Sequence, residues 1–269
     1  MVKRFFSLIQ IDSHYRGNLE NGLPNGTGEL VWQRSGQRYC GEFKNGHRDG
    51  TGTMYYSECS CYKGAWRDGQ QHGFGIMKFS TELVYEGFWE YGKPCGEGTM
   101  RWLDRDEVYS GEWLDGLQHG FGYHEWFVRR IKHSQFPYRN TYEGQWKQGV
   151  KHGEGILVLP NGTRLYGNWS ADKLHGKCRI IHKNGFTIEA EFDSDVCTKI
   201  NTSIETLEEL TPELLFFLKS GKENEQRDRS SHKLESTDVH LLPSLSEAFP
   251  RRLRLKEPRD VVLENVNSS

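Results

Sequence analysis

Residues 142–155 read Tyr-Glu-Gly-Gln-Trp-Lys-Gln-Gly-Val-Lys-His-Gly-Glu-Gly, and the chain repeats this stretch along most of its length. Copies begin at residues 15, 39, 62, 85, 109, 142 and 165, at intervals of 24, 23, 23, 24, 33 and 23 residues. When each copy is numbered from its first residue, glycine occupies positions 3 and 12 in all seven copies and positions 8 and 14 in six. These positions hold 26 of the 30 glycines, so the period indicates tandem structural repeats rather than a glycine-rich composition.

Each copy has the pattern of a β-hairpin. Alternate side chains of a strand point to the same face, so positions 1, 3 and 5 place tyrosine, glycine and tryptophan together, and positions 12, 14 and 16 predict the return strand. Pairs such as Asp68-Gly69 supply the positive φ of a tight turn between them. Because glycine normally weakens a strand, we expect it to leave a slot across which neighbouring rings lie. The predicted aromatic face consists of Tyr39, Phe43, Tyr62, Trp66, Tyr85, Trp89, Tyr109, Trp113, Tyr142, Trp146 and Trp169.

The repeat resembles the MORN repeat. The family unit is similar to Tyr-Glu-Gly-x-Trp followed by x-x-Gly-x-x-His-Gly-x-Gly, and residues 142–155 match it throughout. The resemblance extends from Tyr15 to about Phe192. It implies an all-β repeat protein, an elongated single-layer twisted antiparallel sheet of about seven hairpins. With two strands per repeat, roughly 4.8 Å apart, seven repeats would span on the order of 65–70 Å.

The segments around the repeats divide the chain further. We expect residues 1–14 to form a half-repeat that opens the sheet, residues 15–193 to form the array, and residues 188–192 to be a last strand with no return strand. Residues 194–221 are predicted to form a helical cap, because a terminal repeat needs a covered edge, and residues 222–269 a largely disordered tail. The alternative for this helix is a docking element for a partner. Its predicted apolar face is Leu214, Leu215, Phe217 and Leu218.

The fifth repeat carries an insertion within residues 123–141, of about ten residues. Arginine and aromatic side chains dominate many protein interfaces, and the insertion is rich in both. Its candidate partner-binding residues are Trp126, Phe127, Arg129, Arg130, Lys132, Phe136, Tyr138 and Arg139. The alternative is an extended hairpin whose rings pack back on the sheet.

The same insertion carries a closer resemblance. The sequence runs Gly-Phe-Gly-x-x-x-Trp, then Arg-Arg, Ser-Gln-Phe-Pro and Arg-Asn-x-Tyr-Glu-Gly. This order is similar to the MORN array of radial-spoke head proteins of the ciliary axoneme. The resemblance implies a place in a motile cilium or sperm flagellum.

No chemistry of an enzyme is evident in the sequence. Histidines 72, 119, 152 and 175 all occupy position 11 of their repeats, so neighbours would lie about 10 Å or more apart, too far to share a zinc ion. No phosphate loop or hydrolase motif is present, and we expect neither a metal nor a cofactor. The six cysteines follow no regular spacing, and no apolar run is long enough to cross a membrane. We therefore expect reduced thiols in a cytoplasmic protein.

These features predict a non-enzymatic scaffold, a rigid sheet that displays its strip of rings to an axonemal or cytoskeletal protein. The net charge of −2 gives no reason to expect nucleic acid as a partner. The first alternative is a peripheral phospholipid-binding adaptor, although residues 1–200 carry a net charge of only +1. The second is a regulatory MORN fragment of a larger enzyme. The open ends of such a sheet would also allow end-to-end self-association.

Overall fold

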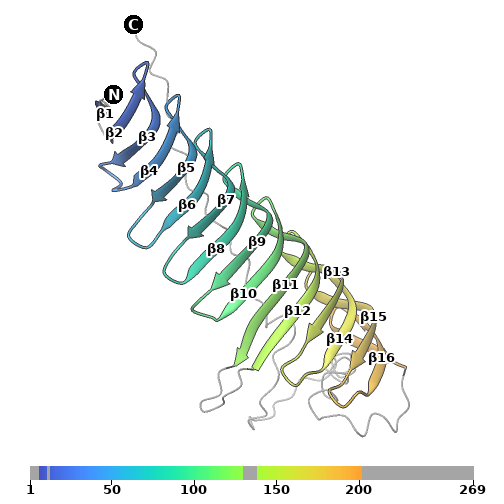
Figure 1. Ribbon diagram of the computed structural model, residues 1–269. Helices are drawn as coiled ribbons and strands as arrows, with labels where there is room; N and C mark the ends of the chain where they lie inside the picture. The colour runs from blue at the N-terminus through green and yellow to red at the C-terminus, as the bar shows by residue number, and fades with distance from the viewer. Residues whose placement is uncertain (1–5, 11–12, 130–137, 202–269) are drawn as a thin grey trace, which may run out of the picture.

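The computed structural model describes residues 6–10, 13–129 and 138–201, with side chains described for residues 13–127 and 139–201. The described residues form one 17-stranded antiparallel sheet, in which every strand pairs with the next along the chain (Figure 1). The hairpins are stacked along one axis, so the array is long and one layer thick. The predicted fold class is therefore confirmed.

The strands follow the repeats, two to each. They are β1 (Phe6–Gln10), β2 (Ser13–Glu20), β3 (Leu23–Trp32), β4 (Arg38–Lys44), β5 (His47–Tyr55), β6 (Cys61–Arg67), β7 (Gln70–Lys78), β8 (Leu83–Glu90), β9 (Lys93–Trp102), β10 (Glu107–Leu114), β11 (Leu117–Arg129), β12 (Tyr138–Lys147), β13 (Val150–Val158), β14 (Arg164–Ser170), β15 (Lys173–Ile181), β16 (Thr187–Asp193) and β17 (Val196–Ile200).

The turn inside each hairpin is shorter than the sequence suggested. In the second repeat it consists of Asn45 and Gly46 alone, with φ of 48° and 86°, the left-handed pair of a type I′ hairpin turn. The return strand therefore begins at position 9, and the extra residues form a bulge at positions 11–13. Gly41 faces Gly52, and Phe43 already faces Arg48, so three residues of β5 oppose one of β4.

The glycines at positions 3 and 14 face each other across the hairpin and make room for the tyrosine of position 1. A Cβ atom placed on Gly98 would lie 2.6 Å from Cζ of Tyr85, and one placed on Gly87 would lie 2.5 Å from the Cα of Gly98. The ring thus lies against bare backbone. The slot predicted from the sequence is present and is filled by the ring of the same repeat.

Twelve aromatic rings from neighbouring repeats contact one another in a single continuous row, which we call the ring ladder. Each contact is edge-to-face, with centroids 5.1–5.4 Å apart. Every tyrosine from the second repeat on touches the position-5 ring of its own repeat and that of the next. In order, the ladder is Tyr15, Phe43, Tyr39, Trp66, Tyr62, Trp89, Tyr85, Trp113, Tyr109, Trp146, Tyr142 and Trp169.

Most of the tyrosine hydroxyls and tryptophan Nε1 groups of the ladder form hydrogen bonds. The hydroxyl of Tyr85 donates to the carbonyl of Phe88 at 3.1 Å, at the position that opposes the bulge. The indole Nε1 of Trp113 donates to the carbonyl of Gly98 in the preceding repeat at 3.0 Å. The same two bonds recur along the array, and buried polar groups need such partners. The repeat therefore buries its aromatic side chains without a second layer of structure.

The C-terminal end of the array differs from the prediction. We expected no strand after residues 188–192, but β17 pairs with β16 and completes an eighth hairpin. Its turn is Ser194-Asp195, with φ of 52° and 73°. Like the Ala171-Asp172 turn of the seventh repeat, it lacks the glycine found in the first six turns. Residues 194–200 therefore belong to the sheet and not to a helical cap. The predicted helix with Leu214, Leu215, Phe217 and Leu218, and the tail from residue 222, lie outside the described residues.

Candidate functional site

The ring ladder is the core of the protein rather than a surface shown to a partner. Its side chains are at most 5% exposed, so the aromatic face named from the sequence is not accessible. Part of the cover comes from position 10 of the preceding repeat. The guanidinium of Arg48 lies 4.4 Å from the centroid of Trp66, and Lys151 Nζ lies 4.3 Å from that of Trp169. A partner must therefore meet the opposite face, which we call the open face, or one of the edges.

The insertion forms an extended hairpin, the alternative left open by the sequence. Strands β11 and β12 remain paired from Gly120 and Trp146 to Arg129 and Tyr138. Trp126 is buried and stacks on His124, with centroids 4.8 Å apart and planes at 27°. Trp126 therefore packs on the ring side of the sheet, because it alternates in register with His124, and it is not available to a partner.

On the open face of this hairpin, four side chains form what we call the hairpin cluster. Arg139 lies 4.4 Å above the ring centroid of Phe127 and forms an ion pair with Glu125. The hydroxyl of Tyr123 donates to the same carboxylate at 2.8 Å. The cluster thus presents arginine and aromatic side chains together. The side chains of the other candidates, Arg129, Arg130, Lys132, Phe136 and Tyr138, lie outside the described residues, and their role stays a prediction.

A buried polar network lies beneath the extended hairpin, and sequence reasoning missed it. His124 Nε2 lies 2.8 Å from Glu107 Oε1, and Arg105 Nη1 lies 3.5 Å from Glu107 Oε2. Both His124 and Glu107 are buried. The available signal was His124 at position 16, where the other repeats carry methionine, leucine or isoleucine. Burial of such groups is costly unless they are bonded, so this pair holds β10 and β11 in one arrangement.

Lys151 is a second buried polar residue that the sequence did not reveal. Its Nζ lies 4.3 Å from the ring centroid of Trp169 and 5.3 Å from that of Tyr142. Burial lowers the pKa of Lys151 to about 7, although the nearby carboxylates of Asp172 and Asp195 act in the opposite direction. These aspartates occupy position 8, where the first six repeats have glycine, and they accept hydrogen bonds from the backbone N–H of Lys151 and Leu174, each at 2.8 Å.

The low pKa of Lys151 predicts a pH-dependent stability. Between pH 7 and about 10.4, the usual lysine pKa, the unfolded chain keeps a proton on this residue that the folded chain releases. The unfolded state then binds more protons, so the free energy of unfolding rises with pH, by up to about 1.4 kcal/mol per pH unit. We expect the wild type to gain about 2 kcal/mol relative to Lys151→Met between pH 7.5 and 9.5. Urea unfolding at both pH values measures this, and identical pH profiles for the two proteins would exclude a deprotonating Lys151.

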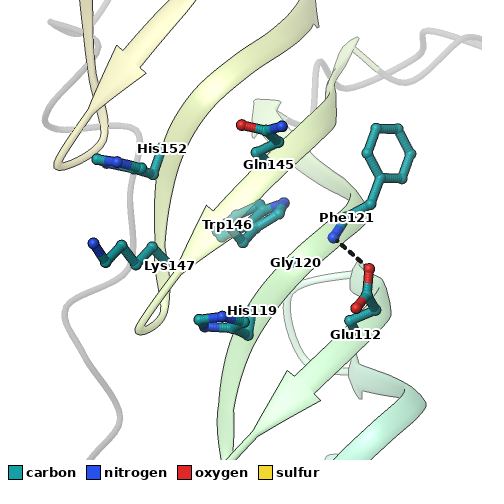
Figure 2. A pocket seen from close by; sticks show the side chains of 8 residues that line it. All are labelled: Glu112, His119, Gly120, Phe121, Gln145, Trp146, Lys147 and His152. Carbon is teal, nitrogen blue, oxygen red and sulfur yellow. Dashed lines mark hydrogen bonds between the residues drawn. The ribbon is translucent and has the colours of Figure 1, made fainter.

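A shallow groove opens at the turn side of the fifth and sixth repeats (Figure 2). It has a volume of about 420 Å³ and is lined by residues of β10, β11, β12 and the start of β13. We call it the turn-side groove; it is lined by Glu112, His119, Gly120, Phe121, Gln145, Trp146, Lys147 and His152. Two of the four position-11 histidines thus share one hollow. Within the described ranges, no three His, Cys, Asp or Glu side chains come together in a way that could hold a metal ion.

Comparison with known proteins identifies the repeat. A family model described as MORN repeat matches residues 15–37, 39–58, 62–83, 85–107, 109–127, 142–164 and 166–187. A search of curated proteins gave no match. In the part of the chain that the structure describes, no helix has the length and apolar character needed to cross a bilayer. The seven matches cover more than half of the sequence and coincide with the seven structural repeats, so the chain belongs to the MORN-repeat family.

Proposed function

We propose that this protein is a non-enzymatic scaffold that binds a protein partner in the axoneme of motile cilia or sperm flagella, in or near a radial spoke. The observation that carries the proposal is the extended hairpin β11–β12. It interrupts an otherwise regular period and places the hairpin cluster on the open face of the sheet. The axonemal location rests on the resemblance of the sequence around this hairpin to radial-spoke head proteins.

The charges of the hairpin favour a protein over a membrane surface. Anionic bilayers attract basic side chains with about 1 kcal/mol per residue near the surface. Arg139 is already paired with Glu125, and Tyr123 donates to the same carboxylate. Arginine held over an aromatic ring is the kind of group that dominates protein interfaces. A peripheral phospholipid-binding adaptor is therefore the rival that a test must separate from the scaffold.

The test removes three basic residues of the insertion. We expect Arg129→Ala, Arg130→Ala and Lys132→Ala together to reduce partner recovery from ciliated-cell extracts at least tenfold, as measured by affinity purification and mass spectrometry. Urea unfolding should be unchanged, because these residues lie beyond the regular repeats. Neither protein should float with phosphatidylserine vesicles.

A matched control removes three basic charges elsewhere. Lys44, Lys63 and Lys78 are exposed and lie on the second and third repeats. Their triple alanine variant should recover the partner as well as the wild type does. If vesicles bind the wild type strongly and release the hairpin variant, while partner recovery is unchanged, the chain is a membrane adaptor and the scaffold proposal is wrong.

A further inference from the structure

The edge that carries the hairpin turns has a regular pattern of side-chain contacts. Residues at positions 6 and 11 lie close together there, and in three repeats they bond to each other. These pairs are Glu20 with Asn25, Arg67 with His72 at 3.3 Å, and Glu90 with Cys95 at 3.7 Å. His175 instead pairs with Asp193 of the following hairpin at 3.3 Å. In four of the seven repeats, a side chain at position 11 is therefore already bound to another side chain of the protein.

The turn-side groove departs from this pattern in two neighbouring repeats. In the fifth and sixth repeats, positions 6 and 11 hold Leu114 with His119 and Lys147 with His152. Among the interactions of the described residues, none engages the ammonium of Lys147 or the imidazoles of His119 and His152. An ammonium and two imidazoles therefore stand in one hollow with their N–H donors available.

The carboxylate in the groove is bonded to the backbone and not to these donors. Glu112 Oε1 accepts the backbone N–H of Phe121 at 2.8 Å, and Figure 2 shows the carboxylate directed to that bond. The neighbouring Gly120, with φ of 59°, has no Cβ where the Glu112 side chain lies. Glu112 keeps its negative charge, but its carboxylate is bonded to the backbone, as that of Glu42 is in the second repeat, where it accepts the N–H of Thr51 at 2.6 Å.

An apolar surface lies beside the donors. The ring of Phe121 is 54% exposed, and the indole of Trp146 lines the groove from the core. In Figure 2 the Phe121 ring points away from the sheet. A ligand that fits must therefore offer negative charge and an apolar group side by side, which excludes a bare inorganic anion as the best occupant.

We propose that the turn-side groove binds an acidic segment of a protein partner, with carboxylates on Lys147 and the two imidazoles and an apolar side chain on Phe121. The groove volume of about 420 Å³ admits the side chains of only a few residues, so the segment is a short linear one. This inference rests on the proposed scaffold function and names a second contact, at the edge opposite the hairpin end.

The array supplies matched controls for a test. Lys44 occupies position 6 of the second repeat, as Lys147 does in the sixth, and both are exposed. Phe74 occupies position 13 of the third repeat and is 51% exposed, close to the value for Phe121. Lys44→Glu and Phe74→Ser therefore make the same chemical changes as Lys147→Glu and Phe121→Ser away from the groove.

The probe is the peptide acetyl-Glu-Leu-Glu-Glu-Leu-amide, titrated into the full chain while the imidazole carbon-bound proton resonances are followed by NMR. We expect the resonances of His119 and His152 to shift and those of His72 and His175 to stay. Lys147→Glu and Phe121→Ser should each weaken binding at least tenfold, and the two control variants should bind like the wild type. The lysine counterpart, acetyl-Lys-Leu-Lys-Lys-Leu-amide, should cause no shift.

Three results would overturn the inference. The first is that the His119 and His152 resonances do not shift at millimolar peptide, and the second is that the control variants lose as much affinity as the groove variants. The third is that phosphatidylserine vesicles shift these resonances and the peptide does not, which would make the groove a binding site for lipid headgroups. Failure of the groove proposal can be distinguished from failure of the scaffold proposal. If the wild type and both groove variants recover the same partner from extracts while the peptide does not bind, the groove proposal is wrong and the scaffold stands.

Discussion

Replacing Trp113 with alanine is expected to lower the free energy of unfolding by about 3–5 kcal/mol, the usual cost of removing a large buried ring. Trp113 touches Tyr85 and Tyr109, each with centroids 5.2 Å apart, and donates to the carbonyl of Gly98. The substitution removes both ring contacts and leaves that carbonyl without its indole donor. Urea unfolding monitored by circular dichroism measures the loss.

Two further variants serve as comparisons, one at a second buried ring and one at a half-exposed ring. Trp126→Ala should also be costly, about 3 kcal/mol, because its ring is buried and stacked on His124. Phe88→Ala, on the open face, should cost less than about 1 kcal/mol, since half of its ring is already exposed. If Trp113→Ala and Phe88→Ala unfold at the same urea concentration, the ladder is not the core.

Replacing Gly98 with alanine is expected to cost about 3 kcal/mol or more, at the upper end for overpacked sites. The new Cβ would lie 2.6 Å from Cζ of Tyr85. That ring cannot move aside, because Trp89 and Trp113 hold it from both sides with centroids 5.2 Å away. As a control, Gly36→Ala places a Cβ with nothing within 4 Å and incurs only the strain of its positive φ of 69°.

The seventh repeat shows how the clash can be relieved. It has Leu165 in place of the tyrosine and Cys178 in place of the glycine at position 14, and both side chains are buried. We therefore expect Gly98→Ala to cost at least about 2 kcal/mol less in a Tyr85→Leu background than in the wild type, within the range of coupling between touching residues. Additive losses in this double-mutant cycle would mean that the tyrosine ring does not require the glycine.

Local pattern was enough to predict the hairpins of the seven repeats and the slot above their glycines. Tyrosine, glycine and tryptophan at alternate positions determine which side chains share a face, and that rule is independent of the rest of the structure. The absence of glycine at Ser194-Asp195 concealed the eighth hairpin, because an aspartate supplies the left-handed turn residue there. The Ala171-Asp172 turn shows the same replacement, but Gly167 and Gly176 still mark the seventh repeat, and the eighth hairpin has neither glycine.

Which face is buried could not be read from the sequence. Position 10 covers the ladder with side chains of no common type, including Arg48, Gln71, Pro94 and Lys151. Polar residues at such positions suggest exposure to solvent, yet Arg48 and Lys151 lie over rings of the following repeat, and this cover could not be foreseen. The turn-side groove was equally hidden, since it depends on which position-6 and position-11 residues are left without a bond to each other.

The ring ladder is a closed core, which leaves the open face and the edges to a partner. Exchange of the indole Nε1 protons in the free protein, followed by NMR, tests this most directly. Trp66, Trp89, Trp113 and Trp146 donate to backbone carbonyls at 3.0–3.4 Å. Their indole protons should exchange only when the array unfolds, over hours or longer at neutral pH and 25 °C. Exchange of all four within seconds would show that the ring face is open to water and is itself a docking surface, which would contradict the account.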